Sequence, residues 1–224
     1  MTDLIPIAPH DLVAMDEYVG SHPLLIDIVY ANADHPRNIF GRAIYRADAR
    51  LWLHRDMADI VLAAAQICYD RHGLLFELKD GLRPVEAQAA MLDTDIVRAH
   101  PQWLEDPRLL SPPGKGGHPR GMAIDIILKT EAGGIVDMGT PFDHLVTDKN
   151  DNPAARDYRG LDDHVYKNRE KLESAMVEAG DRAGKPILPL PAEWWDFRFF
   201  PEYSNQYSPI ADMDLPSQQK MMKS

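Results

Sequence analysis

Cysteine is nearly absent from this 224-residue chain, in which Cys68 is the only one. A single cysteine excludes an internal disulfide, and it argues against a structural zinc site, which usually uses several cysteines. No apolar run approaches the roughly 18 residues needed to cross a bilayer. Residues 1–6 (MTDLIP) have neither the basic region nor the apolar core of a signal peptide. We therefore expect a cytoplasmic protein with no membrane partner.

Positive charge is also scarce, because 24 Lys and Arg residues face 35 Asp and Glu residues, for a net charge of -11. This balance argues against a nucleic-acid partner, which would require a concentrated basic face. Hydrophobic residues make up 45% of the chain and charged residues 26%, as in ordinary globular proteins. The length suits a single domain. We expect it over residues 1–204, with 1–22 as an N-terminal arm, and expect residues 205–224 to be a polar tail that wraps the surface or is disordered.

Hydrophobic spacing gives a coarse view of the fold. Helical periodicity predicts helices over 56–72, 84–98 and 162–179, with Gly73 and Gly180 as stops. Apolar and β-branched runs predict strands over 24–30, 74–78, 123–129 and 194–199, and a hairpin partner over 135–137. Residues 101–117, rich in proline and glycine, predict a long loop. The fold class is therefore α+β: a small, mainly antiparallel sheet with helices packed on one face and a metal site at the sheet edge.

Two segments far apart in the chain carry residues suited to metal chemistry. Residues 117–125 (GHPRGMAID) place His118 seven residues before Asp125, and both are ordinary zinc ligands. Gly121 and Ala123 between them are small enough for the backbone to pass close to an ion. Residues 193–197 (EWWDF) place Glu193 three residues before Asp196, so one element can offer both a general base and a ligand. Three protein ligands with an open position are typical of a catalytic zinc site.

The pattern His-x-x-Gly-x-Ala-x-Asp followed by Glu-Trp-Trp-x-Phe resembles the zinc D-Ala-D-Ala dipeptidases of the VanX type. Residues 78–84 (LKDGLRP) are similar to the family's Asp-Gly-Tyr-Arg-Pro segment, and residues 138–143 (MGTPFD) to its Met-Gly-Ser-x-Phe-Asp segment. Weaker matches to the family's N-terminal segments occur at 30–32 and 38–41. The resemblance thus spans about residues 25 to 200, with four clear segments in the family's order.

This resemblance implies a role for each matching residue. His118 and Asp125 become metal ligands, Glu193 the catalytic acid/base and Arg83 the transition-state stabiliser. Asp143 becomes the group that binds the ammonium end of a dipeptide. The implied activity is metal-dependent hydrolysis of D-Ala-D-Ala, or of a closely similar small dipeptide, in the turnover of cell-wall peptidoglycan precursors.

Two positions depart from the family pattern. Asp196 stands where the family has histidine as its third zinc ligand, and we expect Asp196 to bind the metal in its place. A hard oxygen donor moves the preference of a site from Zn²⁺ toward Mn²⁺ or another divalent ion. His144 and His164 are the alternative replacements. Gly116 stands where the family usually has a serine whose hydroxyl contacts the substrate. We therefore expect Gly116 to lie at the substrate and to alter the selectivity for substrate.

Less specific interpretations of the same residues stay open. Arg83 could pair with Asp80 or Glu86 on the surface, and Asp143 could be a turn residue. Two other functions also stay open: a related metallohydrolase redirected to another peptide or cell-wall fragment, and a metal-free binding protein on the same fold. Glu193 and Arg83 weigh against the binding protein, which has little need of a general base. The oligomeric state is not predicted.

Overall fold

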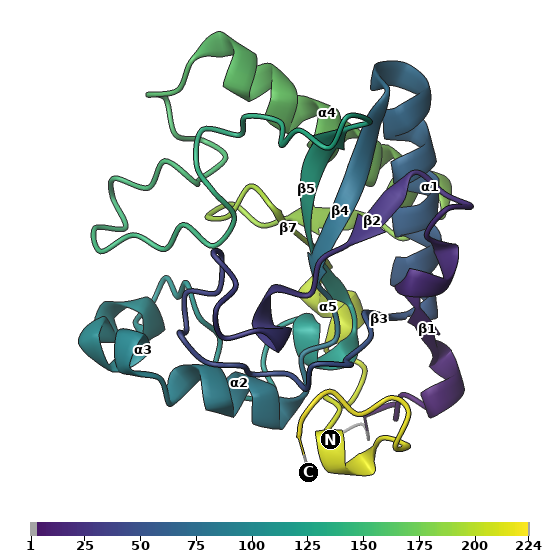
Figure 1. The fold of residues 1–224 in the computed structure, drawn as a ribbon, viewed down its shortest axis with the longest axis vertical. Coiled ribbons are helices and arrows are strands. Elements are labelled where there is room, and N and C mark those ends of the chain that lie inside the picture. The colour runs from purple at the N-terminus through teal and green to yellow at the C-terminus, as the bar shows by residue number, and fades with distance from the viewer. Residues whose placement is uncertain (1–3, 224) are drawn as a thin grey trace.

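The computed structural model describes residues 4–223, so residues 1–3 of the expected arm and Ser224 of the expected tail lie outside it. Its centre is a five-stranded sheet in the order β2-β4-β5-β7-β6 (Figure 1). The strands are β2 (Leu24–Ile26), β4 (Leu74–Asp80), β5 (Ala123–Thr130), β6 (Ile187–Pro189) and β7 (Asp196–Phe199). β2 and β4 are parallel, and every other neighbouring pair is antiparallel. The expectation of a mainly antiparallel sheet is confirmed.

Two long helices cover one face of this sheet. α1 (Arg55–His72) and α4 (Asp163–Arg182) pack on each other, and they contact β4 and β6 respectively. Two shorter helices, α2 (Val85–Leu92) and α3 (Asp95–Ala99), lie on the other side of the sheet from α1, together with long loops (Figure 1). The short α5 (Pro201–Ser204) follows β7. The loops and the shorter helices thus border the face that the long helices leave free.

α1 follows from its sequence in an ordinary way. Its apolar residues recur at helical spacing, and eight of its side chains are buried. Asp56 lies in the first turn, where negative charge favours a helix. Gly73 follows the last turn with φ 63°, the left-handed conformation that commonly ends a helix. The predicted helix over 56–72 is confirmed.

Two predicted helices differ in the structure. The helix expected over 84–98 is interrupted at Thr94, whose backbone is extended and whose hydroxyl donates to the Met91 carbonyl. A threonine that bonds to nearby backbone competes with a continuous helix. α4 continues past Gly180 to Arg182. A Cβ on Gly180 would lie 2.9 Å from Ile187 Cγ1, so this glycine allows β6 to pack closely and does not end the helix.

Smaller differences concern strands. The strand expected over 24–30 ends at Ile26 and gives way to a turn of 3₁₀ helix. The expected hairpin partner at 135–137 forms only one antiparallel bridge, between Ile135 and Lys129. β6 lies between Pro186 and Pro191, in a stretch for which no strand was predicted.

Both ends of the described chain pack against the domain. In the N-terminal arm, β1 (Leu12–Ala14) pairs antiparallel with β3 (Trp52–His54). Residues 205–223 contribute Leu215 and Met221 to the core, and the Asp212 carboxylate accepts from two backbone N–H groups of the same segment. Among the described residues, no helix has the combined length and apolar character of a membrane span.

Candidate active site

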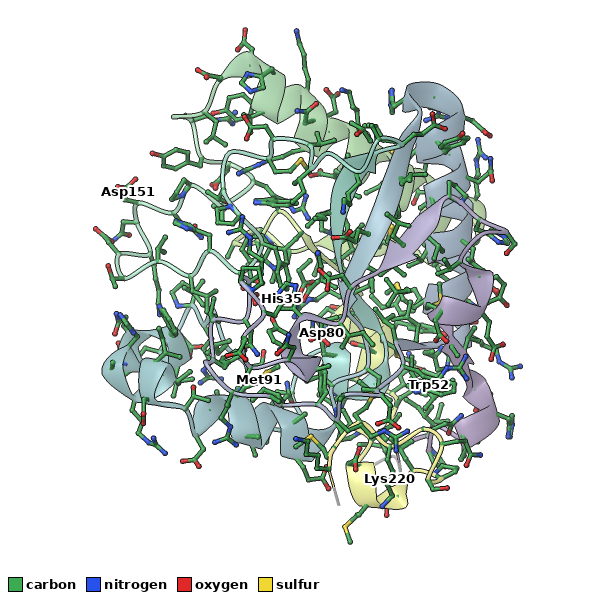
Figure 2. All side chains as sticks on the ribbon, viewed as in Figure 1. His35, Trp52, Asp80, Met91, Asp151 and Lys220 are labelled. Carbon is green, nitrogen blue, oxygen red and sulfur yellow. The ribbon has the colours of Figure 1, made fainter. Side chains whose placement is uncertain are left out.

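Three aspartates lie side by side on the three central strands of the sheet, at the level where β4 ends and β7 begins. Asp80 of β4 is the register partner of Asp125 in β5, which is in turn the partner of Asp196 in β7. None of the three is more than 2% exposed, and Figure 2 shows Asp80 in the middle of the molecule. Like charges directly opposite each other on neighbouring strands are destabilising. The row therefore requires positive charge from elsewhere.

Each outer aspartate has its own arginine. Arg83 donates to Asp80 Oδ2 from Nε at 2.8 Å and from Nη2 at 2.5 Å. Arg198 donates to both oxygens of Asp196, with 2.8 Å between Nε and Oδ1. Burial alone would raise the pKa of Asp196, but Arg198 and His118 hold that pKa below its usual value. Asp80 and Asp196 are thus compensated within the protein.

The central aspartate is compensated only in part. Asp125 Oδ2 lies 3.8 Å from Arg83 Nη2. Asp125 Oδ1 is buried and has no hydrogen-bond partner among residues 4–223. Burial, followed by the carboxylates of Asp196 and Asp80, raises the pKa of Asp125 well above its usual value. An unpartnered buried carboxylate oxygen is costly, and here it marks a place that suits a cation.

His118 faces this unpartnered oxygen. Its Nδ1 lies 2.8 Å from the Gly81 carbonyl, and a proton on Nδ1 would leave the lone pair of Nε2 for a metal. Nε2 lies 3.7 Å from Asp125 Oδ1 and 3.4 Å from Asp196 Oδ2. Asp80, His118 and Asp125 also each offer a ligand atom within 4.8 Å of the others. An imidazole nitrogen with two or three carboxylate oxygens is a donor set that fits a divalent cation.

Glu193 lies in the turn before β7, and its backbone N–H contacts the Leu190 carbonyl. Burial is the main cause that raises the pKa of Glu193 to about 8, and the nearby Asp196 adds to it, while Arg198 opposes it. A carboxyl group that titrates near neutrality is suited to accept and return a proton at neutral pH. The Glu193 carboxyl lines the cavity and can both hold and release a proton near neutral pH.

Asp143 is the one non-glycine residue with a positive φ in the described range, at 59°. Aspartate tolerates this left-handed conformation better than most residues, and Asp143 lies in a turn, as its alternative interpretation predicted. The Tyr30 hydroxyl donates to Asp143 Oδ2. Burial raises the pKa of Asp143 to about 7, against the opposing effects of Tyr30 and Arg83. Asp143 can thus offer an acceptor, and in its ionised form a negative charge, to a ligand.

Gly116 belongs to a loop that α2 holds in place. Gln88 accepts from the Gly114 N–H and donates to the Lys115 carbonyl, and Arg120 donates to the Gly116 carbonyl at 2.9 Å. With φ 84°, Gly116 has a left-handed backbone that a side chain would strain. The loop therefore presents backbone, without a side chain, at this point.

The structure brings the residues predicted from the motifs around one cavity. Its lining includes Arg83, Gly116, His118, Asp125, Asp143, Glu193 and Asp196. The motifs did not identify Asp80 as a possible ligand, nor Arg198, Tyr30 and Gln88 as part of the site. Arg198 was detectable, because residues two apart in a strand point to the same face.

The geometry corrects one expectation, about Gly121, and places the two alternative histidines. Gly121 does not leave room for an ion: a Cβ there would lie 2.7 Å from the His54 backbone nitrogen, so the small residue allows close packing on β3. His164 is 2.9 Å from Asp137 on an exposed part of α4. His144 lines a neighbouring cavity. Neither histidine is among the residues that line the cavity with His118 and Asp125.

Comparisons with known proteins found a family match, a curated relative and a similar solved structure. A family model described as D-ala-D-ala dipeptidase matches residues 10–211. The D-alanyl-D-alanine dipeptidase of Escherichia coli (strain K12) is 31% identical over 191 residues, which cover 83% of this chain and 86% of that protein. The crystal structure of Serratia marcescens L-Ala D-Glu endopeptidase ChiX has a TM-score of 0.38 and 14% identity, covering 67% of this chain and 82% of that one. By the family match and the identity to the Escherichia coli enzyme, the chain belongs to the D-Ala-D-Ala dipeptidase family.

Proposed function

We propose that this protein is a metal-dependent dipeptidase that hydrolyses D-Ala-D-Ala or a closely similar small dipeptide in the turnover of cell-wall precursors. The observation that carries the proposal is the buried, unpartnered Asp125 Oδ1 facing His118 Nε2 at 3.7 Å. Family membership and the Escherichia coli relative support the choice of substrate.

His118, Asp125 and Asp196 would hold the metal, with Asp80 as a further donor nearby. We propose Zn²⁺ as the cofactor. Mn²⁺ is the alternative, because two or three carboxylates favour harder ions than a site with two histidines. When bound, such an ion supplies a Lewis acid that polarises a carbonyl group and makes water more acidic.

Glu193 and Arg83 would carry the proton transfer and the charge stabilisation. Glu193, as carboxylate, takes the proton of the attacking water and then passes it to the leaving amine. Arg83 is held in place by Asp80 and is only 13% exposed, so the surface ion pair considered from the sequence is a buried one. From there its guanidinium can stabilise the oxyanion that develops when the peptide carbonyl becomes tetrahedral.

Asp143 would bind the free ammonium group of the dipeptide. Tyr30 holds its carboxylate, and a cationic ligand would favour the ionised form. Gly116, without a side chain, would leave room beside the substrate. The cavity thus offers an anion for the amino end of a small peptide.

The first experiment measures D-alanine released from D-Ala-D-Ala by metal-stripped protein reloaded separately with zinc, manganese or cobalt. We expect metal-dependent release that Glu193→Gln lowers at least about a hundredfold with bound metal unchanged. Asp125→Asn and Asp196→Ala should lose both activity and metal. Asp137→Asn, which changes an exposed carboxylate away from the cavity, is the matched control and should behave as wild type.

The assay also separates the alternatives. Metal retention without D-alanine release would favour the redirected hydrolase, and other dipeptides would then be tested. Absence of both metal binding and release would favour the metal-free binding protein and contradict the proposal.

A further inference from the structure

Arg198 is a guanidinium whose hydrogen bonds leave one nitrogen free. Nε and Nη2 both donate to Asp196. Nη1 has no hydrogen-bond partner in the described part of the chain. The side chain is 17% exposed and lines the same cavity as Glu193 and His118. Arginine has donors only and carries a fixed positive charge, so a free Nη1 at a cavity wall suits an anionic or strongly accepting group.

A second donor lies beside it because residue 116 is glycine. A Cβ built on Gly116 would lie 3.4 Å from Ser111 Oγ and 3.6 Å from Arg198 Nη1. The hydroxyl and the guanidinium therefore border the same small volume, which no side chain of residue 116 fills. Ser111 also lines the cavity, and within residues 4–223 its hydroxyl makes no hydrogen bond.

The cavity wall carries both an anionic group, Asp143, and a cationic group with a free donor, Arg198. Asp143 is held by Tyr30 and influenced by Arg83 and Asp80, whereas Arg198 is held by Asp196 next to Gly116. Lys115 adds positive charge at the rim near Arg198, because it is exposed and lines the same cavity. A zwitterionic dipeptide carries the complementary charges, an ammonium group at one end and a carboxylate at the other.

We propose that Arg198 Nη1 and Ser111 Oγ bind the carboxylate on the C-terminal side of the scissile bond. This assignment rests on the proposed function, and it makes Arg198 and Ser111 determinants of specificity for the leaving residue. The carboxylate is either the terminal group of the dipeptide or the side chain of an acidic second residue. Charge-assisted hydrogen bonds to such a group are among the stronger ones in proteins.

The test compares substrates in which this carboxylate is terminal, absent or carried on the second side chain. The kcat/KM is measured for D-Ala-D-Ala, for its C-terminal amide, and for D-Ala-D-Glu with its terminal carboxyl amidated. For wild type we expect about a tenfold to hundredfold preference for a substrate that carries the carboxylate over the simple amide. The two acidic substrates distinguish a terminal from a side-chain carboxylate.

Arg198→Gln should reduce this preference to within about threefold of unity, and Ser111→Ala should reduce it severalfold while leaving the Arg198–Asp196 pair intact. Loss of metal or of folding would lower the rates for all substrates alike, so the ratio isolates carboxylate binding. Arg108→Gln is the control, because Arg108 also lines the cavity but is exposed and paired with Asp106. Its preference should equal that of wild type.

An unchanged preference in Arg198→Gln would overturn the assignment. Failure of the proposed function is distinguishable, because wild type would then hydrolyse neither the acid nor the amide. In that case calorimetry of D-Ala-D-Ala and its amide binding to wild type and Arg198→Gln measures the same preference without turnover. Equal affinities of wild type for the two ligands would contradict the carboxylate site.

Discussion

At position 196 an aspartate and an arginine two residues later act as one unit. The family resemblance puts a neutral histidine at 196, whereas this chain has a carboxylate with a pKa held below its usual value, against burial, by Arg198 and His118. Arg198 compensates the extra negative charge, so the pair restores the net charge of a neutral ligand. In the proposed metal site the donor atom would nevertheless change from nitrogen to oxygen, which would alter the preference for the metal.

This leads to a prediction about the ligand. Replacing Asp196→His together with Arg198→Gln restores a nitrogen donor without leaving an unpaired arginine. We expect the affinity for zinc relative to manganese to rise at least about tenfold over wild type, because imidazole favours zinc. Competition with a chromophoric chelator measures both affinities. The single variant Arg198→Gln is the control, and an unchanged ratio in the double variant would mean that Asp196 does not bind the metal.

At this scale the motifs predicted which residues meet, but not all of their contacts. His118, Asp125 and Glu193 line one cavity as the resemblance implied, and family membership itself is confirmed. The roles of these residues stay predictions. The sequence did not predict Asp80 as a possible metal ligand. Its proximity to Asp125 depends on the register of β4 and β5, which no local pattern reveals.

At the scale of elements, local signals predicted α1, β4 and β5 well because each has a clear period and a clear end. The prediction was weaker where tertiary contacts decide. Gly180 reads as a helix stop in the sequence, yet it lies inside α4 because Ile187 packs against it. The composition of residues 205–224 predicts a polar tail, yet the described part buries Leu215 and Met221. The few apolar residues of this segment pack on a surface of the domain that the sequence does not show.

The C-terminal segment also holds the loops of the site. The Ile210 N–H donates to the Pro119 carbonyl at 2.7 Å and the Ile210 carbonyl accepts from Val85, so the segment bridges the residues that follow His118 and Arg83. Arg120 donates to the Tyr207 carbonyl at 2.8 Å. A chain ending at Asn205 would leave these buried groups without partners.

We expect this truncation to lower the free energy of unfolding by at least about 3 kcal/mol, since it removes the buried side chains of Leu215 and Met221, each worth about 1.5–3 kcal/mol. It should also lower kcat/KM, because His118 and Arg83 lose support. Urea unfolding and the D-alanine assay measure the two effects. A chain ending at Met222 is the control. If a chain ending at Asn205 had wild-type stability and activity, the C-terminal segment would stabilise neither the fold nor the loops of the site.

At the scale of the whole molecule, the site concentrates the acidic character of a chain whose net charge is -11. Asp80, Asp125, Asp143, Glu193 and Asp196 outnumber the arginines paired with them, Arg83 and Arg198, by three when every carboxyl is ionised and His118 is neutral, and the other cations at the cavity, Arg108 and Lys115, are exposed to solvent. Without a cation, the protein can relieve this excess only by binding protons. Metal binding and proton binding therefore compete for the same charge.

This competition gives a prediction about pH. Burial raises the pKa of Glu193 to about 8 and that of Asp143 to about 7, whereas the unfolded values are about 4.3 and 3.9. The metal-free fold thus binds more protons than the unfolded chain between about pH 4 and 8, and its stability must fall as pH rises through that window. We expect the Tm of chelator-treated protein to fall by at least about 5 °C from pH 5 to pH 8.

Reloading with zinc should flatten this dependence, because a cation at the site favours the ionised carboxylates, and it should raise the Tm most at pH 8. Thermal unfolding followed by circular dichroism at several pH values, with chelator and with zinc, measures both curves. In Glu193→Gln the metal-free protein should lose part of the slope, because the substituted amide does not titrate. If the metal-free Tm stays constant or rises between pH 5 and 8, the excess of buried negative charge is not what limits the stability of this fold.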